Sequence, residues 1–179
     1  MKRKRIEKDS LGIKKVDNDR LWGAQTQRSL ENFKIGKEII PKELIVALGY
    51  QKKAAALSNM TLGILDKKIG NAILKACDEI INLNLIDQFP LSIWQTGSGT
   101  QTNMNANEVI SNFAIKRLKG KLGSKKPVHP NDHVNLSQSS NDTFPTIMNI
   151  ACNDLIKNKL LKNLDLMVKE LENKSKKFN

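Results

Sequence analysis

The 179-residue chain has no run of about 20 uncharged apolar residues, the length that a membrane-spanning helix requires, so the sequence excludes a membrane protein. Its two cysteines, Cys77 and Cys152, are too few for a disulfide framework or a zinc site, which favours a reducing, cytoplasmic location. Aromatic residues make up only 4% of the chain and leave few side chains to stack on nucleic-acid bases. No apolar block follows the basic residues 1–5, so we expect no signal peptide.

Positive charge is what the sequence has in excess, since 30 lysine and arginine residues against 18 acidic ones give a net charge of +12. A protein that binds nucleic acid usually concentrates such charge on one face or one helix. Here the basic residues are spread along the chain, with a mild excess toward the N-terminus. We therefore expect a solvated, lysine-rich surface and no nucleic-acid partner. A basic nucleic-acid-binding module stays as an alternative, which steeply salt-dependent DNA binding would reveal.

Helical periodicity runs through most of the chain and predicts an all-α fold. Apolar residues recur every three or four positions in four segments, which are residues 41–62, 69–83, 105–120 and 141–179. Asn105 and Glu108 have the spacing of a capping box, which predicts the start of the third helix. Alternating apolar residues are scarce, and the signal for a strand is confined to short pieces near residues 11–16 and around Val134.

The last of these segments predicts a helix that is long for a compact domain. About 35 residues at 1.5 Å each form a rod of roughly 50 Å. Its apolar stripe must be buried against other helices. We expect the rod either to dock in an oligomer or to belong to the front part of a longer protein.

Two polar loops, each followed by a predicted helix, are the candidate binding segments. The first covers residues 95–103, where Gly97 and Gly99 allow a tight turn and a close approach to a ligand. Ser98 and Thr100 add hydroxyl groups, and the following helix directs free N–H groups at the loop, which favours an anion. An ordinary capped turn explains the same residues. No lysine follows in the register of a phosphate-binding Walker loop.

The second loop covers residues 129–142 and holds both histidines of the chain, four residues apart. That spacing is a weak indication of metal ligands, because Pro130 opposes a regular helix and no cysteine or third histidine completes a zinc set. We therefore expect no bound metal. The polar run 137–142 offers hydrogen-bond donors and acceptors without a nucleophile and its base. It suits carboxylate recognition, or it is an extended N-cap in which Asp142 caps the long helix.

Four long, ungapped strings in these regions are distinctive. They are LWGAQTQRS at residues 21–29, TGSGTQTNMN at 96–105, VHPNDHVN at 128–135 and SQSSND at 137–142. Together they resemble class II fumarate hydratase, of the fumarase/aspartase superfamily, and the resemblance covers the chain from about Arg5 onward. Aspartate ammonia-lyase shares that fold and a similar loop. It is kept as the alternative, because the first two strings look more like the hydratase.

The resemblance implies both a fold and an activity. The fold is an N-terminal helical lyase domain over residues 1–138, followed over residues 139–179 by the first long helix of a central helix bundle, which assembles as a homotetramer. The activity is the reversible hydration of fumarate to L-malate, a citric acid cycle step, through a carbanion stabilised as an aci-carboxylate and without a metal or organic cofactor. A developing dianion of this kind needs preorganised donors more than it needs a nucleophile.

The resemblance also implies site residues, position by position. The substrate-binding residues would be Ser98, Gly99, Thr100, Ser139, Ser140 and Asn141. A second anion site near the active-site entrance would consist of Lys126, where the family often has arginine, together with His129, Pro130, Asn131 and Asp132.

The family's motifs for proton transfer do not occur in this chain. The catalytic histidine of the family lies in a Gly-Arg-Thr-His type of motif and the catalytic serine in a Gly-Ser-Ser-x-Met-Pro pattern, and neither string is present. We therefore expect an N-terminal part of a fumarate hydratase with no catalytic residue of its own and no activity when alone. A non-catalytic helical assembly protein with the same fold is a further alternative.

Overall fold

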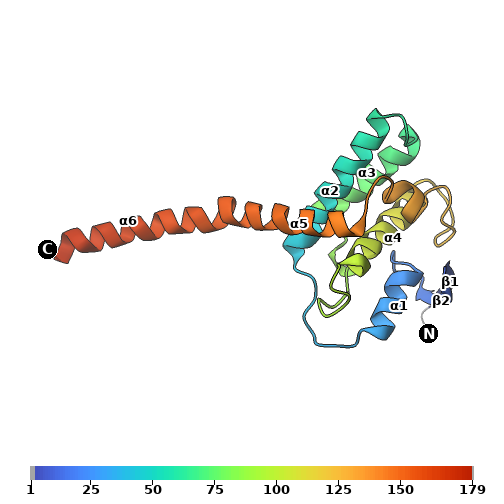
Figure 1. The fold of residues 1–179 in the computed structure, drawn as a ribbon, viewed down its shortest axis with the longest axis horizontal. Coiled ribbons are helices and arrows are strands. Elements are labelled where there is room, and N and C mark those ends of the chain that lie inside the picture. Colours follow the sequence, from blue (N-terminus) through green and yellow to red (C-terminus); the bar gives the residue numbers. More distant parts are fainter. Residues whose placement is uncertain (1–2, 179) are drawn as a thin grey trace.

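The computed structural model describes residues 3–178 and confirms the all-α class, with one small exception near the N-terminus. The helices are α1 (Ala24–Asn32), α2 (Lys42–Thr61), α3 (Lys67–Ile81), α4 (Thr100–Arg117), α5 (Ser140–Leu155) and α6 (Leu161–Phe178). Shorter turns are the 3-10 helix η1 (Ile86–Gln88) and the π-helical turns η2 (Pro130–Val134) and η3 (Ile156–Leu160). Because η3 joins α5 to α6 without a break, the predicted rod is confirmed, and Figure 1 shows it projecting from a compact body.

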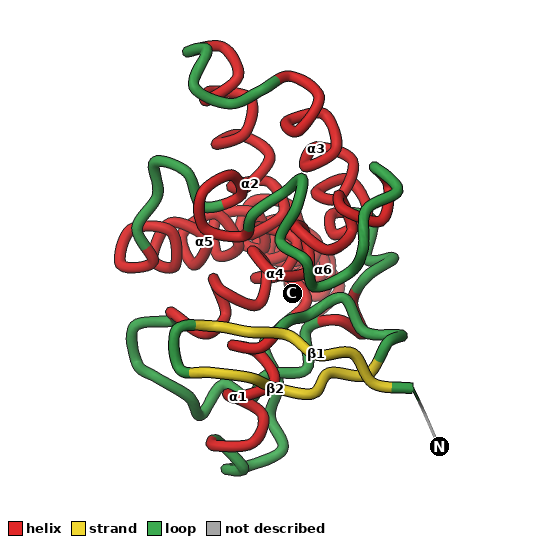
Figure 2. The backbone as a smooth tube through the Cα atoms, turned by 90° about the vertical axis from the view of Figure 1, so that its right-hand side faces the viewer, coloured by secondary structure: helices red, strands yellow, loops and turns green. Residues whose placement is uncertain are grey.

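The exception is an antiparallel hairpin of β1 (Lys4–Asp9) and β2 (Gly12–Asp17), whose strands pair along their full length. It lies against α1 at the edge of the body (Figure 2). The weak strand signal near residues 11–16 corresponds to β2. The signal around Val134 was wrong, because that residue ends the π turn η2.

The first strand gave no signal because its inward positions carry carboxylates. Glu7 and Asp9 are buried. Arg5 Nη2 lies 2.6 Å from Glu7 Oε1, and Arg28 Nη2 of α1 lies 2.8 Å from Asp9 Oδ1. These ion pairs replace the apolar alternation by which a half-buried strand is ordinarily recognised.

The helices α2 and α3 form a hairpin that packs against α4 and α5. The stripe predicted over residues 69–83 is confirmed, since Ile73, Ala76 and Ile80 of α3 are buried. Asp66 caps this helix, its side chain accepting a hydrogen bond from the Ile69 N–H at 3.0 Å. This hairpin supplies the apolar wall against which the site-bearing helices pack.

Helix α4 lies at the centre of the body and is buried along most of its length. It begins five residues before the predicted start, and the predicted capping box was wrong. The Glu108 carboxylate instead accepts hydrogen bonds from the backbone N–H groups of Gly23 (2.9 Å), Gln25 (2.8 Å) and Thr26 (3.1 Å), and from the Thr26 hydroxyl (2.6 Å). Burial raises the pKa of the Glu108 carboxyl, and these donors oppose the shift. Glu108 therefore caps α1, which is distant in sequence.

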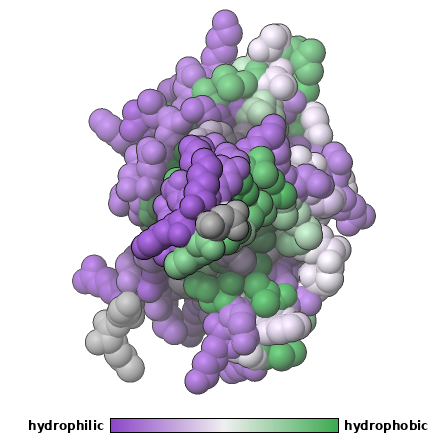
Figure 3. Space-filling model, turned by 90° about the vertical axis from the view of Figure 1, so that its left-hand side faces the viewer, coloured by the Kyte–Doolittle hydropathy of each residue, from purple (hydrophilic) through white to green (hydrophobic). Residues whose placement is uncertain are grey.

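The rod leaves its apolar side open beyond α5. Ile147 and Ala151 are buried where α5 packs on α2, whereas Leu160, Leu164 and Leu171 are 51%, 40% and 61% exposed. Figure 3 looks along the rod from its C-terminal end and shows hydrophilic side chains on one side and hydrophobic ones on the other. An amphipathic helix such as this rod requires other helices to cover its apolar side. Within residues 3–178, no helix combines the length and the apolarity needed to cross a membrane.

We expect Glu108→Gln to lower the free energy of unfolding by about 2–4 kcal/mol, because an NH2 group then faces buried N–H donors that lose their acceptor. Urea denaturation followed by circular dichroism measures the change. The matched control Glu79→Gln alters a half-buried residue whose carboxylate accepts a hydrogen bond from Asn84 at the surface, and it should cost less than about 0.5 kcal/mol. Equal losses in the two variants would contradict the role assigned to Glu108.

Candidate functional site

The N-termini of α4 and α5 lie side by side, so the two predicted binding loops meet. Gly99, the residue before α4, has a φ of +68°, and a Cβ placed on it would lie 2.1 Å from Cγ of the Phe144 ring. Asn103 Nδ2 in α4 donates a hydrogen bond to Ser140 Oγ in α5 at 2.8 Å. Only glycine satisfies both the left-handed backbone and this close approach. The structure thus brings residues 98–100 next to residues 139–141.

Hydroxyl and amide groups are accessible at this junction, which we call the α4–α5 junction. Ser98, Ser139 and Asn141 are exposed, and Thr100 and Ser140 are half-buried. The Ser98 and Thr100 hydroxyls share a hydrogen bond at 2.8 Å. Neutral donors at the positive ends of two helices suit the binding of a carboxylate.

The cap of α5 differs from the prediction. Ser139 is the N-cap, and its Oγ accepts a hydrogen bond from the Asn141 N–H at 3.3 Å. Asp142 was the cap in one of the two interpretations of residues 137–142, but it lies inside the first turn, where its N–H donates to the Ser139 carbonyl at 3.2 Å. A carboxylate in the first turn still interacts favourably with the helix dipole.

A buried lysine that the sequence analysis did not identify lies behind the junction. Lys52 of α2 is 1% exposed, and its Nζ donates to Asn135 Oδ1 and to Gln138 Oε1, each at 2.9 Å. Burial lowers the pKa of Lys52 to about 7. A signal was present in the sequence, because Lys52 stands four residues after Leu48 and four before Ala56, both on the buried side of α2.

The segment that leads into Ser139 is held mainly by amide side chains. Gln138 Nε2 donates to the carbonyls of Val134 (2.9 Å) and Leu136 (3.1 Å), and Asn135 Nδ2 donates to the Gln138 carbonyl at 3.0 Å. Asn59 of α2 donates to the Leu136 carbonyl at 3.0 Å. The loop is therefore tied both to itself and to α2.

The residues of the second predicted anion site lie on and before the π turn η2. His129 Nδ1 accepts hydrogen bonds from the N–H groups of Asn131 (3.3 Å) and Asp132 (3.2 Å). Burial lowers the pKa of His129 and so favours the neutral ring, whose proton lies on Nε2 when Nδ1 accepts hydrogen bonds. The Asp132 carboxylate lies 3.2 Å from the same Nδ1. Pro130 is buried, and Lys126 is exposed at a cis Lys126–Pro127 bond.

The two histidines accept backbone hydrogen bonds within this turn. His133 Nδ1 accepts a hydrogen bond from the His129 N–H at 2.8 Å, so both rings use Nδ1 to bind backbone. Among the side chains that the structure describes, no group of three or more histidine, cysteine, aspartate or glutamate residues is placed to hold a metal ion.

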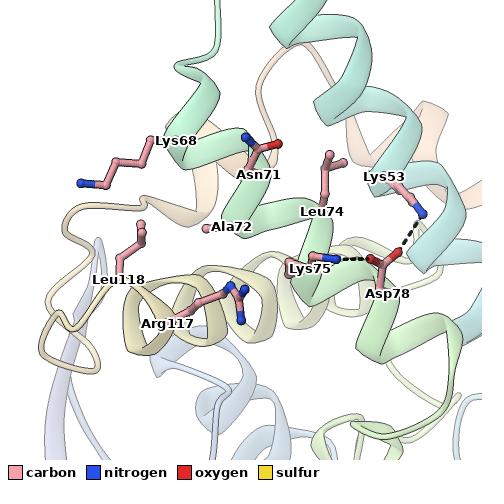
Figure 4. Close-up of a pocket in the computed structure, with 9 residues that line it drawn as sticks. All are labelled: Lys53, Lys68, Asn71, Ala72, Leu74, Lys75, Asp78, Arg117 and Leu118. Atoms are coloured by element: carbon pink, nitrogen blue, oxygen red, sulfur yellow. Dashed lines mark hydrogen bonds and ion pairs between the residues drawn. The ribbon is translucent and has the colours of Figure 1, made fainter.

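A cavity of about 740 Å³ lies elsewhere, between α2, α3 and the end of α4 (Figure 4). Lys53, Lys68, Lys75 and Arg117 line it, and the Asp78 carboxylate lies 2.7 Å from the Lys53 ammonium and 3.8 Å from that of Lys75. Its lining includes no residue of the two predicted binding loops. The cavity is therefore separate from the α4–α5 junction.

Known proteins resemble the chain over almost its whole length. A family model described as a lyase matches residues 12–179. The chain belongs to this lyase family, within the fumarase/aspartase superfamily. A class II fumarate hydratase of Rhizobium meliloti (strain 1021) is 59% identical to this chain over 175 residues, and a mitochondrial fumarate hydratase of Rhizopus oryzae is 60% identical over 176 residues. The crystal structure of a recombinant class II fumarase from Schistosoma mansoni matches with a TM-score of 0.93 at 45% identity.

The relatives are much longer than this chain. The two alignments cover 98% and 97% of this chain but 38% and 35% of the relatives. The structural match covers 96% of this chain and 36% of the Schistosoma protein. This chain thus spans little more than a third of the length of the proteins it matches.

We expect the free energy of unfolding of this chain to rise between pH 7 and pH 9 because of Lys52. Over this range the unfolded lysine, with an ordinary pKa of 10.5, keeps its proton, whereas the buried amine with a pKa of about 7 releases it. The unfolded state then binds more protons, so rising pH favours the folded state, by at most about 1.4 kcal/mol per pH unit. Urea denaturation at several pH values measures the slope.

A matched pair of variants isolates this contribution. Lys52→Met should lose the rise, whereas Lys53→Met, which removes the neighbouring lysine paired with Asp78, should keep it. The range stops at pH 9 because burial raises the pKa of the Cys77 thiol to about 12, and this opposes stability at higher pH. A Lys52→Met profile parallel to that of the unsubstituted chain would show that Lys52 is not the source.

Proposed function

We propose that this chain forms part of the substrate-binding site of a class II fumarate hydratase, which hydrates fumarate reversibly to L-malate. The observation that carries the proposal is the α4–α5 junction, where the first turns of the two helices lie side by side and carry accessible hydroxyl and amide groups. The identity of 59% to a class II fumarate hydratase supports the same substrate. In the complete enzyme, four copies of the full-length chain would associate as a homotetramer.

The junction residues would bind the substrate carboxylates. Ser98, Thr100, Ser139, Ser140 and Asn141 supply hydroxyl or amide donors. Gly99, the remaining member of the set, lets the backbone approach the ligand. Water addition passes through a carbanion whose charge spreads onto a carboxylate, and donors that are already oriented stabilise that charge without reorganising.

The segment before the junction would form the second anion site. Its members are Lys126, His129, Pro130, Asn131 and Asp132. The neutral His129 ring, with Nδ1 occupied by two backbone N–H groups, presents its Nε2–H as a donor. The exposed Lys126 adds a positive charge to the same segment. An anion held here would lie outside the reacting site, so His129 has no part in proton transfer.

A chimera tests the proposal with this chain in a complete enzyme. The chain replaces the matching 175 residues of the Rhizobium meliloti fumarate hydratase and is purified from a host without its own fumarases. We expect the chimera to consume fumarate and form malate, as measured by ultraviolet absorbance. A chimera that assembles like the parent enzyme but converts neither fumarate nor malate would overturn the proposal.

The 179-residue chain alone should show no turnover in the same assay. We place no proton-transfer group in it, and general acid–base groups contribute about 10²- to 10⁴-fold each. Measurable hydration by the isolated chain would show that a proton-transfer group had been overlooked among its residues.

In the chimera, Thr100→Ala and Asn141→Ala should each lower kcat/KM about ten- to hundredfold. Each removes a donor to a carboxylate, a charge-assisted hydrogen bond worth roughly 1.5–3 kcal/mol. His129→Asn should have a much smaller effect. If the only role of Asn141 were to help cap the N-terminus of α5, Asn141→Ala would instead lose about 1 kcal/mol of stability with kcat/KM nearly unchanged. Melting temperatures and kcat/KM of the three variants separate these accounts, and the site assignment is wrong if His129→Asn is the most damaging.

The open apolar side of the rod predicts self-association of the isolated chain. Leu160, Leu164 and Leu171 are exposed there, and a contiguous apolar surface is covered most simply by copies of the same helix. Sedimentation velocity should give a mass above the 20.1 kDa of one chain. The double variant Leu164→Lys, Leu171→Lys should sediment as a monomer with unchanged helicity. A monomeric unsubstituted chain at high concentration would refute the prediction.

A further inference from the structure

We propose that Lys52 is a positioning residue, which holds residues 139–141 and Asn103 in register at the α4–α5 junction through Asn135 and Gln138. The inference rests on the proposed function for its catalytic consequence, while its structural part stands on the contacts of this chain. Lys52 itself lies behind the junction and is buried, so it acts through other side chains.

The environment of Lys52 is unfavourable for a cation. Within residues 3–178, no carboxylate lies within ion-pair distance of its ammonium, and its two hydrogen-bond partners are the neutral amides of Asn135 and Gln138. Burying a charge without a counter-charge opposes folding, so an apolar side chain of the same length would suit stability better. What a lysine adds at this position is a set of N–H donors aimed at two amide oxygens.

Those two contacts orient both amides, together with Gln51 Nε2, which also donates to Gln138 Oε1 at 3.2 Å. With Oδ1 turned to Lys52, Asn135 presents Nδ2 to the Gln138 carbonyl. With Oε1 turned to Lys52, Gln138 presents Nε2 to the carbonyls of Val134 and Leu136. The loop conformation therefore depends on which way these amides face, and the N–H groups of Lys52 favour that orientation because each requires an acceptor oxygen.

The path continues to the proposed substrate-binding residues. Asn135 Oδ1 accepts a second hydrogen bond from Asn103 Nδ2 at 3.1 Å, and the same Nδ2 donates to Ser140 Oγ at 2.8 Å. Ser137, between the two amides, has a φ of +61°, a left-handed conformation that a serine adopts only when its surroundings impose it. Loss of the Lys52 contacts would release this segment, and displacements near 1 Å at a binding group are enough to slow an enzyme strongly.

A double-mutant cycle in the chimera distinguishes positioning from general destabilisation. We expect Lys52→Met to lower kcat/KM at least tenfold in an otherwise unsubstituted chimera but less than threefold in an Asn141→Ala background, since Lys52 is proposed to act through residues 139–141, of which Asn141 is one. The matched control Lys53→Met, one residue along α2, should stay within twofold. Additive losses from Lys52→Met and Asn141→Ala, or no loss from Lys52→Met, would overturn the proposal.

Hydrogen exchange in the 179-residue chain gives a second readout that needs no activity. Peptides covering residues 134–141 should exchange at least tenfold faster in Lys52→Met than in the unsubstituted chain, while peptides of α3 exchange at the same rate. If Lys52→Met does not fold, Lys52→Gln shortens the side chain and removes its charge while leaving Asn135 and Gln138 in place, and it should produce the same local increase. Unchanged exchange over residues 134–141 would overturn the positioning role. An inactive chimera with the predicted exchange would overturn only the proposed function.

Discussion

Helix α4 is buried on nearly all sides, and the hydrogen bonds of its polar side chains hold the loops around it. Glu108 caps α1, Asn105 donates to the Gln88 carbonyl at 3.0 Å, and Ser111 donates to the Val128 carbonyl at 2.8 Å. Asn103 reaches the loop before α5. Buried polar groups must find partners, so the polar side of α4 determines where the irregular segments lie. The junction of α4 with α5 follows from this arrangement.

Two buried ionisable groups, Glu108 and Lys52, are held by neutral partners, unlike Glu7 and Asp9, which form ion pairs. Glu108 is surrounded by N–H and O–H donors, and Lys52 faces amide oxygens, so neither depends on an opposite charge. The α4–α5 junction carries neutral hydroxyl and amide groups. Such a site binds an anion through oriented dipoles, which are already in place before charge develops on the ligand.

Periodicity predicted the parts of the fold that bury apolar stripes, such as α3 and the rod from Ser140 to Phe178. The β1–β2 hairpin was largely missed, because Glu7 and Asp9 occupy its inward positions. The predicted capping box failed because its rule is local, whereas the partners of Glu108 are 82 to 85 residues away. Motif strings located both candidate loops, but Lys52 lies outside them. Its contacts exist only after α2 and the loop have packed together.

The proposed function depends above all on carboxylate binding at the α4–α5 junction. A crystal structure of the chimera with an unreactive dicarboxylate analogue of fumarate tests it most directly. The account predicts one carboxylate of the analogue within hydrogen-bond distance of Thr100 and Asn141, with Ser140 held by Asn103 as in the unbound chain. An analogue bound away from both residues, for instance in the basic cavity beside Arg117, would contradict it.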